Sequence, residues 1–265
     1  MCFWYGFRVV NLFTEDHAAT TGAREVIVRE ELKPERSFNA NLNYQRYLAT
    51  SFGVLSIDAT LFHTRFSNKI IADYETNDNQ IVYDNLDGHA ISQGASLNLD
   101  FAFTFPLKIM AGITAMEVYS MDRNANTGNL ERNRQLLTEN FSGTFAISYT
   151  VPKWNLSIDY TGNVYGPMKL PILENDFRKE FSDTYSLQNI QITKKFANGF
   201  EVYGGIKNLL NFTPPANSIM RAFDPFDKTA DDPVTNPNGY TFDPTYVYAP
   251  NQGIRGFLGV RYTVK

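Results

Sequence analysis

The stretch Ser96-Leu97-Asn98-Leu99-Asp100-Phe101-Ala102-Phe103-Thr104-Phe105 decides the fold. Apolar side chains occupy every second position, and small polar side chains occupy most of the positions between them. Because successive side chains of a strand point to opposite faces, this pattern predicts a strand with one apolar and one polar face. The same alternation occurs at 38–45, 55–61, 141–151 and 154–161, and more weakly at 189–193, 200–207 and 258–263. With the segment from Leu107 to Tyr119, we expect about nine to ten strands and no helix.

The strands and their connections are typical of a membrane barrel. Strands of about ten to fourteen residues are long for a globular protein and suit a tilted membrane-crossing strand. Short connections at 46–52, 105–108, 151–154 and 196–200 alternate with long polar ones at about 67–82, 120–138, 166–184 and 211–251. Outer-membrane barrels have this alternation, with short periplasmic turns and long extracellular loops.

Aromatic residues gather at both ends of the expected strands. Near the short turns are Tyr44, Tyr47, Phe52, Phe103, Phe105, Tyr149, Trp154, Phe196 and Phe200. Near the opposite ends are Phe62, Phe66, Tyr119, Tyr165 and Tyr185. Two interfacial girdles would explain both groups, although aromatic residues favour strands in general. In a barrel the apolar rows would face lipid and the Asn, Ser, Thr and Asp rows would face the interior. A soluble β-sandwich with the opposite orientation stays open.

Composition and motifs argue against several other classes of protein. The formal net charge of -4 argues against a nucleic-acid binder, and the mean hydropathy of -0.30 without a long apolar run excludes a bundle of membrane helices. The single cysteine, Cys2, permits no internal disulfide, and we expect no metal or cofactor because the three histidines (His17, His63 and His89) are scattered. Phosphate loops, a nucleophile elbow and a Ser/His/carboxylate set are lacking, so we do not expect an enzyme.

Several segments together resemble one receptor family. They are Gly6-Phe7-Arg8, Leu32-Lys33-Pro34-Glu35, Tyr83-Asp84-Asn85, Gly205-Ile206-Lys207-Asn208-Leu209-Leu210-Asn211, and Gly253-Ile254-Arg255 leading into Val260-Arg261-Tyr262. With these segments in this order, the chain resembles the C-terminal part of the barrel of a TonB-dependent outer-membrane receptor of the Bacteroidota type. The resemblance implies an all-β, partial transmembrane antiparallel β-barrel, with about nine to ten strands of a 22-stranded barrel.

The sequence departs from this family in ways that predict a fragment. Residues 1–265 would be the C-terminal part of the barrel, without the N-terminal plug, the earlier strands, the TonB-engaging segment or a signal peptide. The chain also ends in Tyr262-Thr263-Val264-Lys265, where family members commonly end in an aromatic residue. We therefore expect a truncated gene or gene fragment that belongs to an outer-membrane protein.

The resemblance implies uptake of a scarce nutrient, of the iron-siderophore or cobalamin type, with energy from TonB. Expected partners are outer-membrane lipid, the nutrient, and TonB-ExbB-ExbD through the missing plug. Receptors of this family also take up oligosaccharides with a surface lipoprotein, which is the alternative for this chain. Side chains of the long loops could bind an anionic or ring-bearing ligand through charge and stacking, or could simply pack within the loops. These candidates are Arg123, Arg132, Arg134, Arg178, Arg221, Tyr240, Tyr246 and Tyr248.

An acidic cluster lies in the longest loop. Carboxylate oxygens are ligands for calcium, but the spacing of these residues does not follow that of a calcium-binding loop. The expectation is therefore a solvated loop. The cluster consists of Asp224, Asp227, Asp231 and Asp232.

Overall fold

The structure is a computed structural model of the whole chain, and it is dominated by antiparallel strands. The residues that it describes are 2–8, 25–29, 32–73, 80–124, 127–172, 179–215, 220–221, 234, 241–242 and 246–264. Among these residues, no helix has the length and apolar character needed to cross a membrane.

One antiparallel sheet of eleven strands forms the body of the molecule. Ten strands follow one another in sequence order across it, and β9 (Leu130–Arg134) pairs with the loop end of β8. The ten are β1 (Cys2–Arg8), β3 (Glu35–Thr50), β4 (Gly53–Ser67), β7 (Gly88–Phe103), β8 (Leu107–Arg123), β10 (Phe141–Val151), β11 (Leu156–Tyr165), β12 (Tyr185–Lys195), β13 (Phe200–Lys207) and β16 (Arg255–Tyr262). The predicted partial all-β barrel is confirmed.

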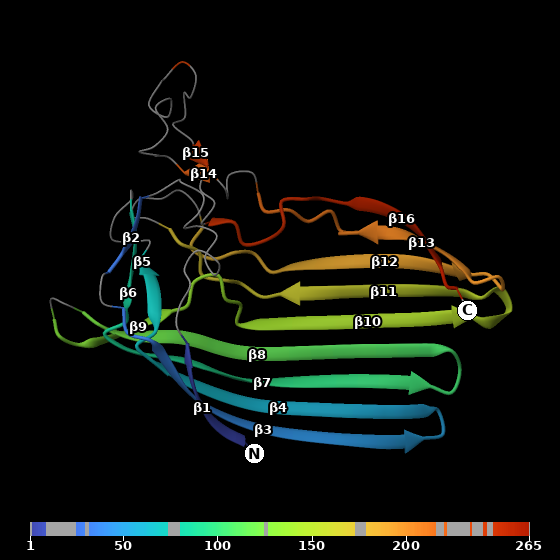
Figure 1. The fold of residues 1–265 in the computed structure, drawn as a ribbon, viewed down its shortest axis with the longest axis horizontal. Coiled ribbons are helices and arrows are strands. Elements are labelled where there is room, and N and C mark those ends of the chain that lie inside the picture. Colours follow the sequence, from blue (N-terminus) through green and yellow to red (C-terminus); the bar gives the residue numbers. More distant parts are fainter. Residues whose placement is uncertain are drawn as a thin grey trace.

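The two ends of the sheet differ, as the connections predict. Short turns lie at one end and the long connections at the other (Figure 1). The turn between β10 and β11 is a 3-10 helix over Pro152–Trp154, closed by Asn155 in the left-handed conformation (φ 46°). A short polar side chain tolerates this conformation better than most, so the residue type suits the turn.

The long connections contain strands that the sequence did not predict. A small sheet is formed by β2 (Glu25–Val28), β6 (Gln80–Asn85) and β5 (Ile70–Asp73), and β14 (Met220–Arg221) pairs with β15 (Thr241–Phe242). The strands of the body are also longer than expected, with 15 to 17 residues in β3, β4, β7 and β8. Ladder pairing therefore continues past the apolar segments from which the strands were predicted.

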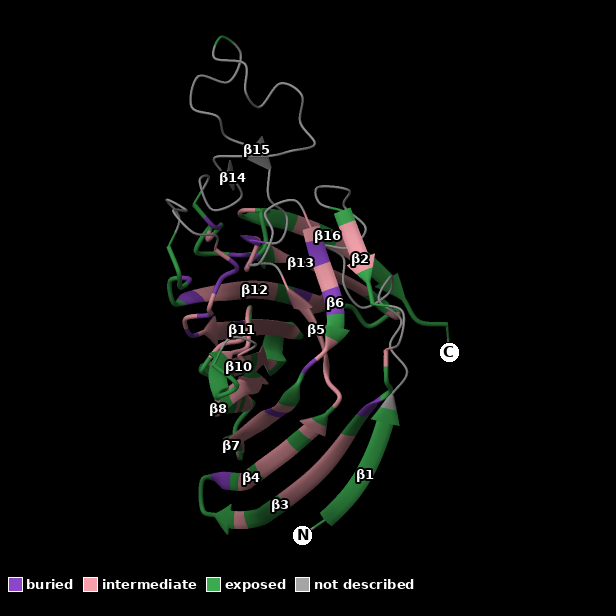
Figure 2. Cartoon of the chain, turned by 90° about the vertical axis from the view of Figure 1, so that its left-hand side faces the viewer, coloured by how far each residue is buried: buried purple, intermediate pink, exposed green. Residues whose placement is uncertain are grey.

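The sheet curves into an open trough. Seen from the loop end, its strands trace an arc from β1 through β8 to β16 (Figure 2). The apolar row that includes Leu97 (39% exposed), Leu99 (38%) and Ile113 (56%) is accessible over the middle of the strands. The polar row that includes Asp58, Asn98 and Thr144 lines a hollow of about 350 Å³. This arrangement suits a sheet whose apolar surface contacts lipid, and it differs from the alternative sandwich, in which these apolar residues would be buried.

Four residues assigned to the outer aromatic girdle lie on the other face: Phe62, Phe66, Tyr165 and Tyr185. The register pairs Phe62 with Gly94 and Phe66 with Ala90, so both rings share the face of Asp58 and Asn98. Gly94 leaves room for Phe62, because a Cβ there would lie 2.7 Å from Cζ of that ring. Phe62 and Phe66 therefore pack inside the trough near the loop end.

A buried cluster lies at the loop end of β11 and β12. It contains Met168, Tyr185 and Ala249, with Tyr165, Leu187, Phe212 and Tyr248 packed against it. The ring of Tyr185 stacks on those of Tyr165 (centroids 4.9 Å apart) and Phe212 (4.6 Å). The cluster joins the connection between β11 and β12 to the longest connection, between β13 and β16.

Candidate functional site

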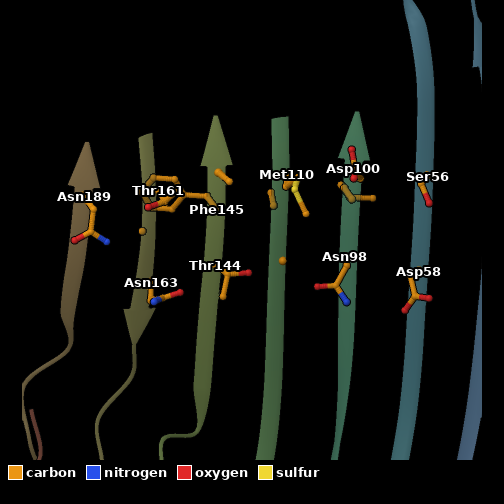
Figure 3. Close-up of a pocket in the computed structure, with 15 residues that line it drawn as sticks. Ser56, Asp58, Asn98, Asp100, Met110, Thr144, Phe145, Thr161, Asn163 and Asn189 are labelled. Atoms are coloured by element: carbon orange, nitrogen blue, oxygen red, sulfur yellow. The ribbon is translucent and has the colours of Figure 1, made fainter. Parts of the chain in front are cut away.

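The polar row is the most regular feature of the inner face. Strand register places Asp58 beside Asn98, Asn98 beside Gly112, Gly112 beside Thr144, and Thr144 beside Asn163. A second row, one step toward the turns, contains Ser56, Asp100, Met110, Ala146, Thr161 and Asn189. Figure 3 shows side chains from both rows around the hollow. Sequence alternation predicts this surface, although no residue of it is among the predicted ligand contacts.

Hydrogen bonds and ion pairs, including those of Glu201 with Lys195 and Arg261, link side chains of the inner face across strands. Lys108 Nζ lies 3.2 Å from Asp100 Oδ2, and Ser148 donates to Asp159 Oδ1 at 2.6 Å. At Gly112 an added Cβ would lie 2.4 Å from Asn98 Oδ1 and 2.9 Å from Thr144 Oγ1. The inner surface is therefore a hydrophilic lining with neutral amide and hydroxyl groups and few charges, suited to contact with water or with another polar surface.

The structure brings three of the predicted ligand contacts, Arg123, Arg132 and Arg134, together on the β8–β9 hairpin. Arg123 donates to the Gly128 carbonyl (2.8 Å), and its Nε is 3.5 Å from Asp87 Oδ2. Arg132 donates to Glu117 and lies 3.9 Å above the ring of Tyr119. Arg134 donates to the carbonyl of Pro167 at 2.8 Å.

These arginines are separate from the inner polar rows. The register places Arg132 opposite Met121 and Arg134 opposite Tyr119, on the face that continues the apolar outer surface of the sheet. Each guanidinium already has a partner within the chain. A ligand would therefore have to compete with or add to these contacts.

Two predicted tyrosines belong to the packed loop unit. Tyr246 is 2% exposed, and its hydroxyl donates to the carbonyl of Lys179. The ring of Tyr248 lies 5.9 Å from that of Tyr185, whose hydroxyl donates to the Tyr248 carbonyl at 3.2 Å. Burial raises the pKa of the Tyr248 hydroxyl, and the nearby charge of Asp183 raises it further. This hydroxyl is therefore neutral at physiological pH.

The remaining predicted residues cannot be placed in the same detail. Arg178 and Tyr240 lie outside the described residues, and so do Asp224, Asp227, Asp231 and Asp232. Arg221 lies in β14, opposite Thr241, but its side chain is not described. Within the described residues, no group of three or more His, Cys, Asp or Glu side chains could hold a metal ion.

Two asparagines of the segment 205–211 hold the ends of the longest connection together. Buried Asn208 donates from Nδ2 to the carbonyls of Phe212 (2.7 Å) and Gln252 (3.1 Å), and its Oδ1 accepts from the Phe212 amide (3.0 Å). Asn211 Oδ1 accepts from the Ile254 amide at 2.8 Å. Both side chains therefore satisfy backbone groups at the two ends of this connection. Both adopt the left-handed conformation (φ 52° and 54°).

Comparisons with solved structures show the same fold in two transporters and an import receptor. The FrpB iron transporter from Neisseria meningitidis (F3-3 variant) superposes with a TM-score of 0.59 at 14% identity, covering 97% of this chain and 36% of that one. Copper transporter OprC gives a TM-score of 0.62 at 11% identity, covering 99% and 36%. The ferric-catecholate import receptor Fiu from K12 E. coli gives 0.56 at 12% identity, covering 89% and 29%. The chain thus spans about a third of the length of these proteins.

Sequence comparison identifies the family directly. No curated protein matches the sequence. The family model described as TonB dependent receptor-like, beta-barrel matches residues 5–209, from β1 to just past the end of β13. Because this match covers well over half of the chain and agrees with the sheet, its register and its connections, the protein belongs to the family of TonB-dependent receptor-like β-barrels.

Proposed function

We propose that the chain forms part of the barrel wall of an outer-membrane receptor that takes up a scarce nutrient with energy delivered through TonB. The proposal rests mainly on the two faces of the sheet. An accessible apolar surface of this size on a soluble protein would favour aggregation, whereas in a bilayer it is the surface that contacts lipid. The polar lining would then face a lumen and, in the complete receptor, a plug.

We propose a metal-bearing nutrient, of the iron-siderophore or cobalamin type. The three similar structures reported above are named for iron, copper and a ferric catecholate. This supports a chelate over an oligosaccharide, which stays as the alternative outcome of the uptake test. Ligand contact by the eight loop arginines and tyrosines is likewise a proposal.

The proposed orientation can be tested by labelling cysteines on the two faces. Two single-cysteine variants are made in a Cys2→Ser background. Leu97→Cys places a thiol on the apolar face of β7, and Asn98→Cys places a thiol on the polar face at the neighbouring position. After insertion into lipid vesicles, the thiol at position 98 should react with a charged maleimide, whereas the thiol at position 97 should be protected. A fluorophore at position 97 should be quenched by brominated lipid. Equal reactivity of the two positions, or protection of position 98 alone, would contradict the proposal.

Uptake can be tested in the source organism by deleting the gene. Growth of the deletion strain is compared with ferric siderophore, cobalamin or an oligosaccharide as the limiting nutrient, in otherwise identical medium. We expect a growth defect on the metal-bearing nutrients that the gene restores and that a TonB-inactivated strain reproduces. A defect confined to the oligosaccharide would assign the receptor to sugar uptake, and a defect that is independent of TonB would overturn the proposed energy source.

A further inference from the structure

The hollow on the inner face of the sheet has the size and the lining of a ligand site. We call it the inner hollow. Its volume of about 350 Å³ lies within the usual range for small-molecule sites, about 300–1,000 Å³. It lies at mid-strand, and strands from β4 to β12 contribute to its lining (Figure 3). It is separate from the loop residues that we predicted as ligand contacts.

Most polar groups that line the inner hollow carry no charge. Each side-chain amide or hydroxyl can both donate and accept hydrogen bonds. Such a lining can bind the amide, hydroxyl and hydroxamate groups of a ligand without any ionic contact. The amides are those of Asn98, Asn163 and Asn189, and the hydroxyls are those of Ser56, Thr144 and Thr161 (Figure 3).

The charge of the inner hollow comes from two carboxylates. The charge of Asp100 is compensated, because Lys108 Nζ lies 3.2 Å from its Oδ2. Asp58 lines the hollow opposite Asn98, and within the described part of the chain it has no ion-pair partner. The hollow therefore keeps one uncompensated negative charge. This charge repels an anion and tolerates an uncharged or cationic ligand.

The inner face of β13 and β16, with the end of β12, carries the opposite charge. We call this surface the basic wall. Glu201 pairs there with Lys195 (3.9 Å) and with Arg261 (3.1 Å). Lys207 lies directly opposite Arg255 on the same face, which places two like charges side by side. An anionic ligand would therefore be attracted to the basic wall rather than to the inner hollow.

Aromatic rings occupy the small positions of the basic wall. A Cβ at Gly259 would overlap the ring of Tyr203, and a Cβ at Gly205 would lie 2.9 Å from Phe257 Cζ. The guanidinium of Arg261 lies 5.8 Å from the Tyr203 ring. These rings take up the space that the glycines leave, whereas the inner hollow is open. A ligand that moves along the inside of the sheet therefore finds room at the hollow.

We propose that the nutrient passes through the inner hollow and that it is uncharged or cationic rather than polyanionic. The amides and hydroxyls of the lining exchange hydrogen bonds with the polar groups of the nutrient, and Asp58 selects against negative charge. Among iron chelates, this charge separates the uncharged trihydroxamate complexes from the trianionic triscatecholate complexes. The inference rests on the proposed uptake function and adds the charge class of the nutrient.

The charge preference of the inner hollow can be measured without transport. The full chain with Cys2→Ser and Asn98→Cys is inserted into lipid vesicles at low ionic strength. Its thiol is then labelled with a cationic or an anionic methanethiosulfonate, and each rate is divided by that of a short cysteine peptide. We expect a cation-to-anion ratio of about ten, because a unit charge about 6 Å away changes the local concentration of each probe about threefold in water.

Charge-neutralising variants assign this ratio to one side chain. Asp58→Asn should bring the ratio to within about twofold of one, and Asp58→Glu should keep it. Asp84→Asn removes an exposed carboxylate from the small sheet of the loops and is the matched control, which should leave the ratio unchanged. A ratio near one without any substitution at position 58, or an unchanged ratio in Asp58→Asn, would overturn the charge preference.

The charge class of the nutrient is tested by uptake in the source organism. The probes are an uncharged iron(III) trihydroxamate complex and a trianionic iron(III) triscatecholate complex. We expect TonB-dependent uptake of the trihydroxamate to be at least about tenfold faster. Ala146→Phe, which fills the hollow, should slow this uptake about tenfold. Ala102→Phe is the same change at an exposed position of the inner face nearer the turns, and it should leave the rate unchanged.

The outcomes separate the inner hollow from the proposed function. If neither chelate is taken up through TonB, the proposed uptake of a chelate is wrong and the passage through the hollow is wrong with it. If the triscatecholate is taken up as fast as the trihydroxamate, or if Ala146→Phe and Ala102→Phe have equal rates, only this inference is wrong. Where Ala146→Phe misfolds, a bulky thiol reagent on Asn98→Cys fills the hollow after folding and should slow uptake in the same way.

Discussion

Gly162 on β11 leaves room for the ring of Phe145, its partner on β10. A Cβ at position 162 would lie 2.5 Å from Phe145 Cζ, and the ring also packs 5.3 Å from that of Tyr160. Gly→Ala usually stabilises a strand by up to about 1 kcal/mol through the unfolded state. Here we expect the clash to dominate, so Gly162→Ala should lower the free energy of unfolding by about 1–2 kcal/mol in a denaturant titration in lipid vesicles. In a Phe145→Ala background the same change should cost nothing, and an equal cost in both backgrounds would refute the mechanism.

Asp122 lies beyond the apolar part of β8, and its carboxyl makes the stability of the folded chain depend on pH. Desolvation is the main reason why the pKa of its carboxyl is raised, and the charge of Asp87 adds to it. The folded state therefore binds this proton more tightly, so stability falls as pH rises from the usual aspartate pKa, about 3.9, through the raised value. Asp122→Asn keeps the acceptor for the Arg123 amide (2.9 Å) and should flatten this fall in denaturant titrations between pH 3.5 and 7. Glu131→Gln, in the partner strand, is the control, and an unchanged slope in Asp122→Asn would contradict the assignment.

At the scale of elements, the ends of the longest connection depend on one side chain. Replacing buried Asn208 by Ala removes three hydrogen bonds and leaves the Phe212 and Gln252 backbone groups without this partner. We expect a loss of about 2–3 kcal/mol in the free energy of unfolding, because unsatisfied buried groups cost about 1–3 kcal/mol. Amide exchange at Phe212 and cleavage of the connection by protease should both accelerate. Asn198→Ala, in the short turn between β12 and β13, is the control and should leave the protease pattern unchanged.

Sequence alternation predicts the strands of the main sheet. It does not predict β9 or the contacts between the loops. Alternation at 96–105 predicts both faces of β7, because one side of the strand is apolar throughout. β9 has the sequence Leu-Glu-Arg-Asn-Arg and carries no such alternation, since it pairs only with the polar end of β8. Phe62 and Phe66 could not be assigned to a face by residue type. Their position follows from the register of β4 with β7, and Gly94 on β7 leaves room for the ring of Phe62. Contacts between distant loops, such as that of Tyr246 with Lys179, depend on chain paths that local sequence does not encode.

At the scale of the whole molecule, the register turns many weak local preferences into two continuous surfaces. Single residues such as Asn98 or Leu97 carry little information about a membrane. The ladder from β3 to β12 aligns the polar residues in rows on one face and the apolar residues on the other. The polar lining could therefore be predicted as a surface. The candidate ligand residues were chosen from loop composition alone, and the structure places the three described arginines on the opposite side of the sheet from that lining.

The difference between the two surfaces should be measurable as an asymmetry between neighbouring residues at mid-strand. Ile113 lies on the outer face of β8 and is 56% exposed, whereas Thr114 is paired with Ser96 and Ser142 on the inner face. An arginine facing the bilayer midplane costs about 2–4 kcal/mol, while one facing a wet lumen keeps most of its hydration. Ile113→Arg should therefore destabilise the inserted chain by about 2–4 kcal/mol, and Thr114→Arg by less than about 1 kcal/mol. Unfolding by denaturant in lipid vesicles gives both values, and the difference should shrink in detergent micelles, which deform around a charge. Equal costs in vesicles would mean that the apolar face does not contact lipid.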